Sequence, residues 1–274
     1  MSMINSFLRP LFDGLLYPFR GLHPLVGLTV VSLVAAIGIL YVFKLTSNQD
    51  KLAAVKRKIH AGLFEIRLFN DNPRAILRAQ LDILRHNLTY LRLAMVPLLW
   101  MIVPLVLVIA QLQFHYGYRG LDPGQSTLVK VELAAAAGRP QAILHAPAGV
   151  AVEAGPAWLP ALNEVAWRIA AVEPGDYELD LEIGGESLSK SVRVSNDVVR
   201  RSPIRPSAAF ADQLLYPAEP PLPRGSAVRA IHVVYPPGDA GIPGWESEWT
   251  WMIVFFVLSM VFAFALRKPL GVTF

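Results

Sequence analysis

Residues 25 to 43 read LVGLTVVSLVAAIGILYVF, a run without a single charged side chain. At a rise of about 1.5 Å per helical residue, such a run is long enough to cross a hydrocarbon core roughly 30 Å thick. We therefore predict a first transmembrane helix over residues 25 to 44. The composition agrees, because 54% of the chain is hydrophobic and only 17% is charged, which is unusual for a soluble domain.

Two further runs predict transmembrane helices over residues 93 to 113 and 248 to 267. The first of these contains Pro97 and Pro104, each of which removes a backbone donor and is expected to bend the helix. The second is flanked by residue types that favour the membrane interface, namely Trp245, Trp249, Trp251, Arg267 and Lys268. The sequence thus predicts an α+β membrane protein with three spans.

The orientation follows from the basic residues between the first two spans. These are Lys44, Lys51, Lys56, Arg57, Lys58, Arg67, Arg74, Arg78, Arg85 and Arg92. Because short loops rich in Lys and Arg stay in the cytoplasm, we expect the N-terminus outside and the tail 268–274 in the cytoplasm. Residues 114 to 247 are then exported, and the protein is expected to be a multi-pass protein of the cell's inner (plasma) membrane.

The segment 1–24 places apolar residues among polar ones, and we expect Pro10 and Pro18 to break it. We interpret it as an external amphipathic helix that lies in the membrane interface before the first span. The alternative is a signal peptide, since Arg9 precedes apolar residues, although no small-x-small cleavage site follows.

Residues 45 to 92 predict an antiparallel helical hairpin in the cytoplasm. Two stripes of apolar residues recur at steps of three and four, and Asn70-Asp71-Asn72-Pro73 separates them, with Asn72 as a helix cap. We expect the two stripes to pack against each other. They are Val55, Ile59, Leu63, Ile66 and Phe69 in the first helix, and Ile76, Leu77, Leu81, Leu84, Leu88 and Leu91 in the second.

The basic face of the first hairpin helix carries Lys51, Lys56, Arg57 and Lys58. It is either a solvated surface that keeps the loop in the cytoplasm or a contact site for anionic lipid or the ribosome. No aromatic residues interleave with the lysines as base recognition would require, so DNA is not an expected partner.

In the exported segment 114–247 the apolar period changes to two, which predicts antiparallel strands joined by turns at Pro174-Gly175 and Gly184-Gly185. We expect an immunoglobulin-like β-sandwich with Trp167 at its centre. The predicted strands span 127–133, 141–146, 164–172, 176–183, 188–194 and 228–235. A Pro-rich loop, 200–224, interrupts them, and its Arg200, Arg201 and Arg205 are either solvated or in contact with lipid head groups.

Catalysis has no support in the sequence, which has no cysteine and whose six histidines lack the spacing of a metal site. We therefore expect no catalytic residue, cofactor or metal, and no enzyme. Four polar residues in or beside the spans are candidates for a groove, namely Thr29, Ser32, Lys44 and Ser259. They either allow close helix packing or line a partly hydrophilic groove for a substrate segment.

The order of these elements resembles the core of the YidC/Oxa-type membrane insertase superfamily. Three segments carry the resemblance: RPLFDGLLYPFRGLHPLVG before the first span, KLTSNQDKLAAVKRKI after it, and PLLWMIVPLVLVIAQL in the second. Bacterial members carry an arginine in the first span, whereas this span is uncharged until Lys44. An exported β domain between the last two spans also departs from the family pattern.

The resemblance implies an insertase-like or chaperone-like protein of membrane biogenesis, which shields client segments entering the bilayer. The alternative is a non-catalytic structural subunit or adaptor of a larger membrane complex, which docks an exported partner through the β-sandwich. Membrane lipids and other membrane proteins are the expected partners in both cases.

Overall fold

The computed structural model describes residues 2–69, 72–134, 138–245 and 247–272. Within these ranges the chain is an α+β protein with six α-helices and two antiparallel sheets. It divides into two compact units, which are described separately. The first comprises residues 1–29 and 109–254, and the second comprises residues 30–108 and 255–274.

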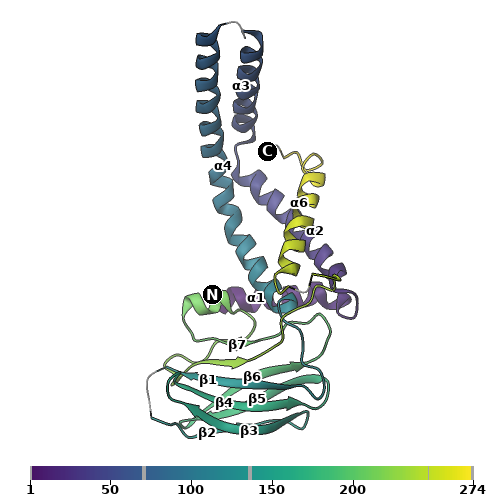
Figure 1. The fold of residues 1–274 in the computed structure, drawn as a ribbon, viewed down its shortest axis with the longest axis vertical. Helices are drawn as coiled ribbons and strands as arrows, with labels where there is room; N and C mark the ends of the chain where they lie inside the picture. The colour runs from purple at the N-terminus through teal and green to yellow at the C-terminus, as the bar shows by residue number, and fades with distance from the viewer. Residues whose placement is uncertain (1, 70–71, 135–137, 246, 273–274) are drawn as a thin grey trace. The chain divides into compact units, whose positions relative to one another are not determined.

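The first unit contains the two sheets (Figure 1). The five-stranded sheet has the order β3-β4-β1-β8-β7, and the three-stranded sheet has the order β2-β5-β6. The strand bounds are Ser126–Leu133 (β1), Ala142–His145 (β2), Val150–Leu159 (β3), Glu164–Ala171 (β4), Gly175–Ile183 (β5), Glu186–Val194 (β6), Ile204–Arg205 (β7) and Val228–Val233 (β8).

One hydrophobic core joins the two sheets. Val129 and Ile169 from the larger sheet and Leu181 and Val192 from the smaller one belong to the same buried cluster. Trp167 is only 2% exposed in this cluster, so its predicted place in the core is confirmed. The alternation of apolar and polar residues therefore locates the buried face of most strands.

Six of the eight strands were predicted from the sequence, and β3 and β7 were not. The residues of β3, VAVEAGPAWL, include a Gly-Pro step and are exposed along most of their length. Its pairing with β4 shifts register twice, as expected where Gly and Pro interrupt a strand at a sheet edge. The turn at Gly184-Gly185 is confirmed, because both residues have positive φ between β5 and β6.

Helix α1 covers Ser2–Leu16 and continues through Pro10, so the predicted break there is wrong. A short 3-10 turn, Tyr17–Phe19, follows it. A six-residue helix, α5 (Phe210–Leu215), lies within the Pro-rich loop.

The helices outside the β domain are α2 (Pro24–Thr46), α3 (Gln49–Leu68), α4 (Pro73–Tyr116) and α6 (Thr250–Leu266). Among the described residues, α2 and α4 are long and apolar enough to cross a membrane, with mean hydropathies of 2.5 and 2.7 in their most apolar windows. The predicted second hairpin helix and second span are one uninterrupted helix, α4. Helix α6 is apolar but has only 17 residues.

The turn between α3 and α4 is capped as predicted. The side chain of Asn72 accepts hydrogen bonds from the backbone N–H groups of Arg74 and Ala75, at 3.1 and 3.2 Å. Pro73 then begins α4. Asn70 and Asp71, the first half of the predicted turn, lie outside the described residues, as do Thr273 and Phe274 of the predicted tail.

Candidate functional site

The second unit presents a row of exposed leucines on α4, which we call the leucine face. Its side chains are between 57% and 68% exposed. They recur at steps of three and four, so they share one side of the helix, and they are Leu77, Leu81, Leu84, Leu88 and Leu91. The prediction that these leucines pack against α3 is therefore wrong.

The contact between α3 and α4 uses a different face. A Cβ atom added at Gly62 of α3 would meet the side chain of Ile83, and both Gly62 and Ala79 are buried. Ala79 and Ile83 follow Leu77 and Leu81 by two residues, which is about 200° of helix rotation. The leucine face consequently points away from α3, while small residues at the contact let the two helices approach closely.

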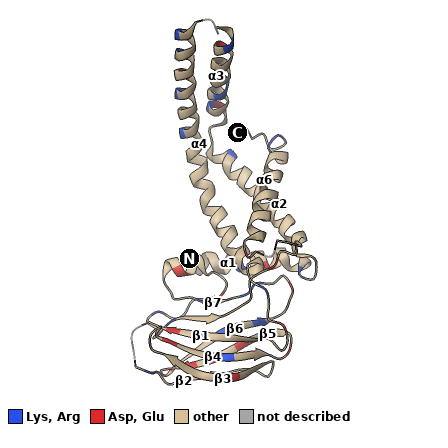
Figure 2. Ribbon diagram, in the orientation of Figure 1, with Lys and Arg blue, Asp and Glu red and all other residues tan. Residues whose placement is uncertain are grey.

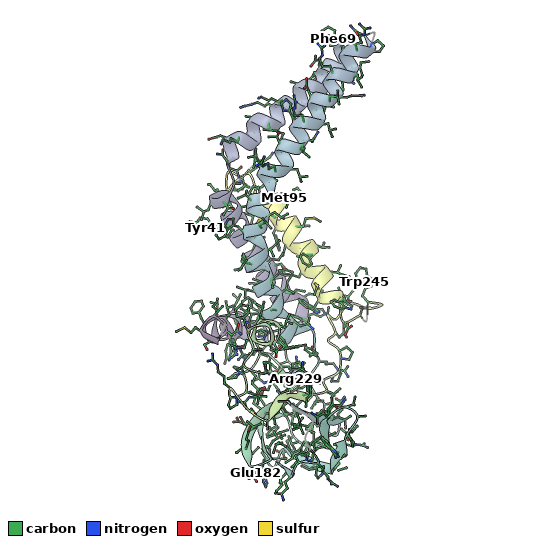
Figure 3. The ribbon with its side chains drawn as sticks, turned by 90° about the vertical axis from the view of Figure 1, so that its left-hand side faces the viewer. Tyr41, Phe69, Met95, Glu182, Arg229 and Trp245 are labelled. Atoms are coloured by element: carbon green, nitrogen blue, oxygen red, sulfur yellow. The ribbon has the colours of Figure 1, made fainter. Side chains whose placement is uncertain are left out.

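The first stripe of the hairpin is only partly covered. Val55, Ile59 and Ile66 are half-buried as predicted, whereas Leu63 and Phe69 are exposed. Phe69 follows the last residue of α3 (Figure 3). Phe64 and Leu68 add further exposed apolar surface to α3. Apolar surface of this kind outside a core is typical of an interaction site.

The exposed side of α4 continues beyond the hairpin. Met95, Leu98, Ile102 and Val106 follow Leu91 at steps of three and four, and all four are exposed. In the most apolar window of α4, only 6% of the residues are buried. One apolar track therefore runs without interruption from the leucine face into the most hydrophobic part of α4.

A row of arginines borders the leucine face. Arg78, Arg85 and Arg92 each follow a leucine of the face by one residue, which places them about 100° around the helix. All three are exposed. Figure 2 shows Lys and Arg on both helices of the hairpin. Of the predicted contact residues, Lys51, Arg57 and Lys58 are exposed and Lys56 is half-buried.

The four residues predicted to line a groove are not gathered at one site. The hydroxyl of Thr29 donates to the carbonyl of Leu25 in its own helix, at 2.7 Å. Ser32 and Ser259 are both buried, and the Ser259 hydroxyl lies 3.5 Å from the Ser32 carbonyl. Lys44 donates to the carbonyl of Leu270, at 2.9 Å. The structure thus brings Ser32 and Ser259 together at a contact between α2 and α6.

In the first unit, polar residues tie α1 to the end of α4 and to the Pro-rich loop. The carboxylate of Asp13 lies 3.2 Å from Nε2 of the buried His115 and 2.8 Å from Arg200. Burial alone would raise the pKa of Asp13, but the hydrogen bond to His115 and the charge of Arg200 outweigh it and lower that pKa. The ionised carboxylate therefore holds three segments together.

The Pro-rich loop is fixed to the β domain by a buried ion pair. Nζ of Lys190 in β6 lies 2.5 Å from a Glu219 oxygen and 2.9 Å from the Ser202 hydroxyl, which itself donates to Glu219 at 2.7 Å. Lys190 is completely buried. Burial opposes ionisation of Glu219, yet the charge of Lys190 and the hydrogen bonds lower the pKa of Glu219.

The arginines of this loop were expected to be either solvated or in contact with lipid head groups, but Arg201 and Arg205 donate hydrogen bonds within the protein instead. Arg201 is 3% exposed and donates to the backbone carbonyls of Tyr118, Ser195 and Asp197. Burial lowers the pKa of Arg201 to about 10. Arg205 donates to Ser189 and to the carbonyl of Pro220. These guanidinium groups hold the loop in place, so the interpretation of a solvated loop is wrong for its arginines.

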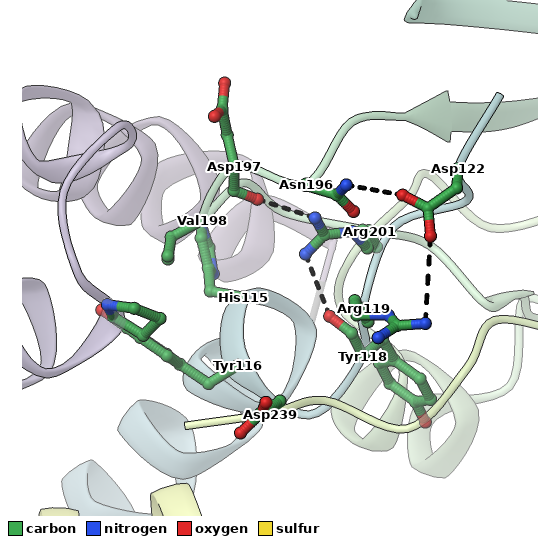
Figure 4. Close-up of a pocket in the computed structure, with 11 residues that line it drawn as sticks. His115, Tyr116, Tyr118, Arg119, Asp122, Asn196, Asp197, Val198, Arg201 and Asp239 are labelled. Atoms are coloured by element: carbon green, nitrogen blue, oxygen red, sulfur yellow. Dashed lines mark hydrogen bonds and ion pairs between the residues drawn. The ribbon is translucent and has the colours of Figure 1, made fainter. Parts of the chain in front are cut away.

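A cavity of about 290 Å³ lies beside Arg201 (Figure 4). Asp122 on its wall accepts from Asn196 at 2.6 Å and lies 3.9 Å from Arg119. The polar lining is thus largely engaged in contacts within the domain. Within the described ranges, no group of three His, Asp or Glu residues is placed to hold a metal ion.

Compared with known proteins, the chain matches no family model, no curated protein and no solved structure. The resemblance to the YidC/Oxa superfamily therefore remains a hypothesis that rests on the three quoted segments and on the order of elements. The apolar track on α4 is the feature of the described structure from which a function can be argued.

Proposed function

We propose that this chain is a non-enzymatic, insertase-like or chaperone-like protein of membrane biogenesis. In this proposal α2, α4 and α6 provide three spans at residues 25–44, 93–113 and 248–267. The N-terminus is outside, the hairpin and tail are in the cytoplasm, and the immunoglobulin-like β-sandwich is exported. At about 1.5 Å per residue, the 17 residues of α6 reach roughly 26 Å, near the lower limit for a span.

The apolar track on α4 is the observation that carries the proposal. A client segment leaving water can cover the leucine face, where each fully buried leucine contributes about 1.5 to 3 kcal/mol. The same side of the helix continues from Leu91 to Val106, so the segment can move toward the bilayer without losing apolar contact. The bordering arginines suit acidic side chains of the client or lipid phosphates.

Site-specific photo-crosslinking in cells tests this proposal. A benzophenone amino acid at Leu84 reports on the leucine face, and the same group at the exposed Asp82 is the control, because Asp82 lies well around the helix from that face. After a short pulse of radiolabel, Leu84 should yield adducts with many newly made membrane proteins, and Asp82 should yield few. Equal adducts at both positions would exclude the leucine face as the client site.

The second candidate is a structural subunit or adaptor of a larger membrane complex. It is favoured by Ser32 and Ser259, which are buried at a helix contact rather than exposed to a client. In that case the Leu84 crosslinker should give one stable adduct with an abundant partner, and its yield should not depend on ongoing protein synthesis. The β-sandwich would then dock an exported subunit.

A further inference from the structure

Helix α1 has two unlike faces. Asn5, Arg9 and Asp13 recur at steps of four and lie on one side. Met3, Phe7 and Leu11 also recur at steps of four, and all three are exposed. Each precedes a residue of the polar set by two positions, which places it about 200° around the helix from that residue. An apolar stripe therefore lies opposite the polar one.

The polar side chains of α1 form hydrogen bonds within the first unit. Asn5 donates to the carbonyl of Gln213 at 2.7 Å, and Arg9 donates to the carbonyls of Pro217 and Glu219 at 2.5 and 2.8 Å. These bonds fix α1 against the Pro-rich loop. The apolar stripe is consequently the face that remains available to another surface.

Helix α5 adds apolar surface next to α1. The bond from Asn5 reaches Gln213 of α5, and Phe210 and Leu215 of this short helix are 67% and 61% exposed. The loop that carries α5 is held by the buried pair of Lys190 and Glu219. Two large apolar side chains are thus exposed on a segment that is firmly attached to the β domain.

We propose that α1 and α5 form one apolar platform, which inserts into the bilayer leaflet on the side of the β domain and holds that domain against the membrane. Chain continuity identifies lipid as the occupant, because α1 ends at Leu16 and the apolar helix α2 begins at Pro24. Helices that bury an apolar face at the depth of the head groups are bound by apolar area. The inference rests on the membrane location proposed above.

Spin labels on single cysteines can test the platform, because the chain has no cysteine of its own. The purified full chain carries one nitroxide at Phe210, Leu215 or Phe7 and is reconstituted in phosphatidylcholine nanodiscs at one copy per disc. Leu162, exposed in the loop between β3 and β4, is the control outside the platform. Trp100, exposed in the predicted second span, is the control for membrane insertion itself.

Relaxation by oxygen, which concentrates in lipid, is compared with relaxation by a water-soluble nickel chelate. We expect labels at Phe210, Leu215 and Phe7 to gain oxygen access and lose nickel access relative to Leu162. Nickel access at Phe210 and Leu215 equal to that at Leu162 would overturn the platform, while shielding at Trp100 would still support the spans. Nickel access at Trp100 would instead overturn the membrane location. An unchanged melting temperature shows that each labelled variant is folded.

Discussion

The buried ion pair between Lys190 and Glu219 is expected to stabilise the β domain strongly. In Glu219→Gln the amide keeps the shape of the side chain but leaves Lys190, which is completely buried, without its counter-charge. Removing one partner of a buried pair costs about 3 to 5 kcal/mol. The Ser202 hydroxyl and the backbone N–H of Ser191 lose a charged acceptor as well. We expect the free energy of unfolding of the β domain to fall by this amount.

The assay is native-state hydrogen exchange of the full chain in detergent micelles, followed over β4, β5 and β6. The matched control is Arg229→Gln, which removes an exposed ion pair with Glu132. Exposed pairs contribute about 0.2 to 1 kcal/mol, so this control should change exchange little. A Glu219→Gln variant whose core strands exchange no faster than those of Arg229→Gln would refute the assignment of the pair to the stability of the domain.

Three other predictions follow from the β domain and from the predicted topology. Trp167→Ala should lower the unfolding free energy by about 3 to 5 kcal/mol in the same exchange assay, and unchanged exchange in β4 would place this side chain outside the core. The pKa values of Asp13 and Glu219 are lowered in the folded chain, so their stabilisation should be present at neutral pH and lost as pH falls below about 4. A melting temperature that is flat from pH 6 to pH 3 would contradict this. In a topology test, single cysteines replace Ser6, Ser47 or Ser187. An impermeant thiol reagent should label intact cells at the first and third positions only, and labelling at Ser47 would contradict the predicted topology.

Local patterns predicted the elements that depend on neighbouring residues. The period of two located six strands, and the apolar runs located α2 and α4. Asn72 was recognised as a helix cap because capping depends on the residues directly after it. Strand β3 was missed because Gly155-Pro156 interrupts its alternation at the edge of the sheet.

Contacts between distant residues could not be predicted in the same way. The spacing of the leucines in α4 shows that they share one side of the helix, but spacing alone does not say which side meets α3. The small residues Gly62 and Ala79 determine which side of α4 packs against α3. The partners Lys190 and Glu219 are 29 residues apart, and no local pattern joins them. The sequence does contain a signal for the contacts of α1, because Asn5, Arg9 and Asp13 form a polar stripe along this helix.

We propose that the leucine face receives client segments on their way into the bilayer. The most direct measurement is protease protection of a newly made client in vesicles that contain purified protein. In the test variant Leu81, Leu84 and Leu88 are replaced by Gln, which favours helix about as well as Leu does. The control variant, Asp82→Gln with Thr89→Gln, changes exposed residues away from the face.

Wild type and the control variant should protect the client well above empty vesicles, and the leucine variant should lose most of that protection at equal reconstituted amounts. Full protection by the leucine variant, or no protection by the wild type above empty vesicles, would contradict the claim.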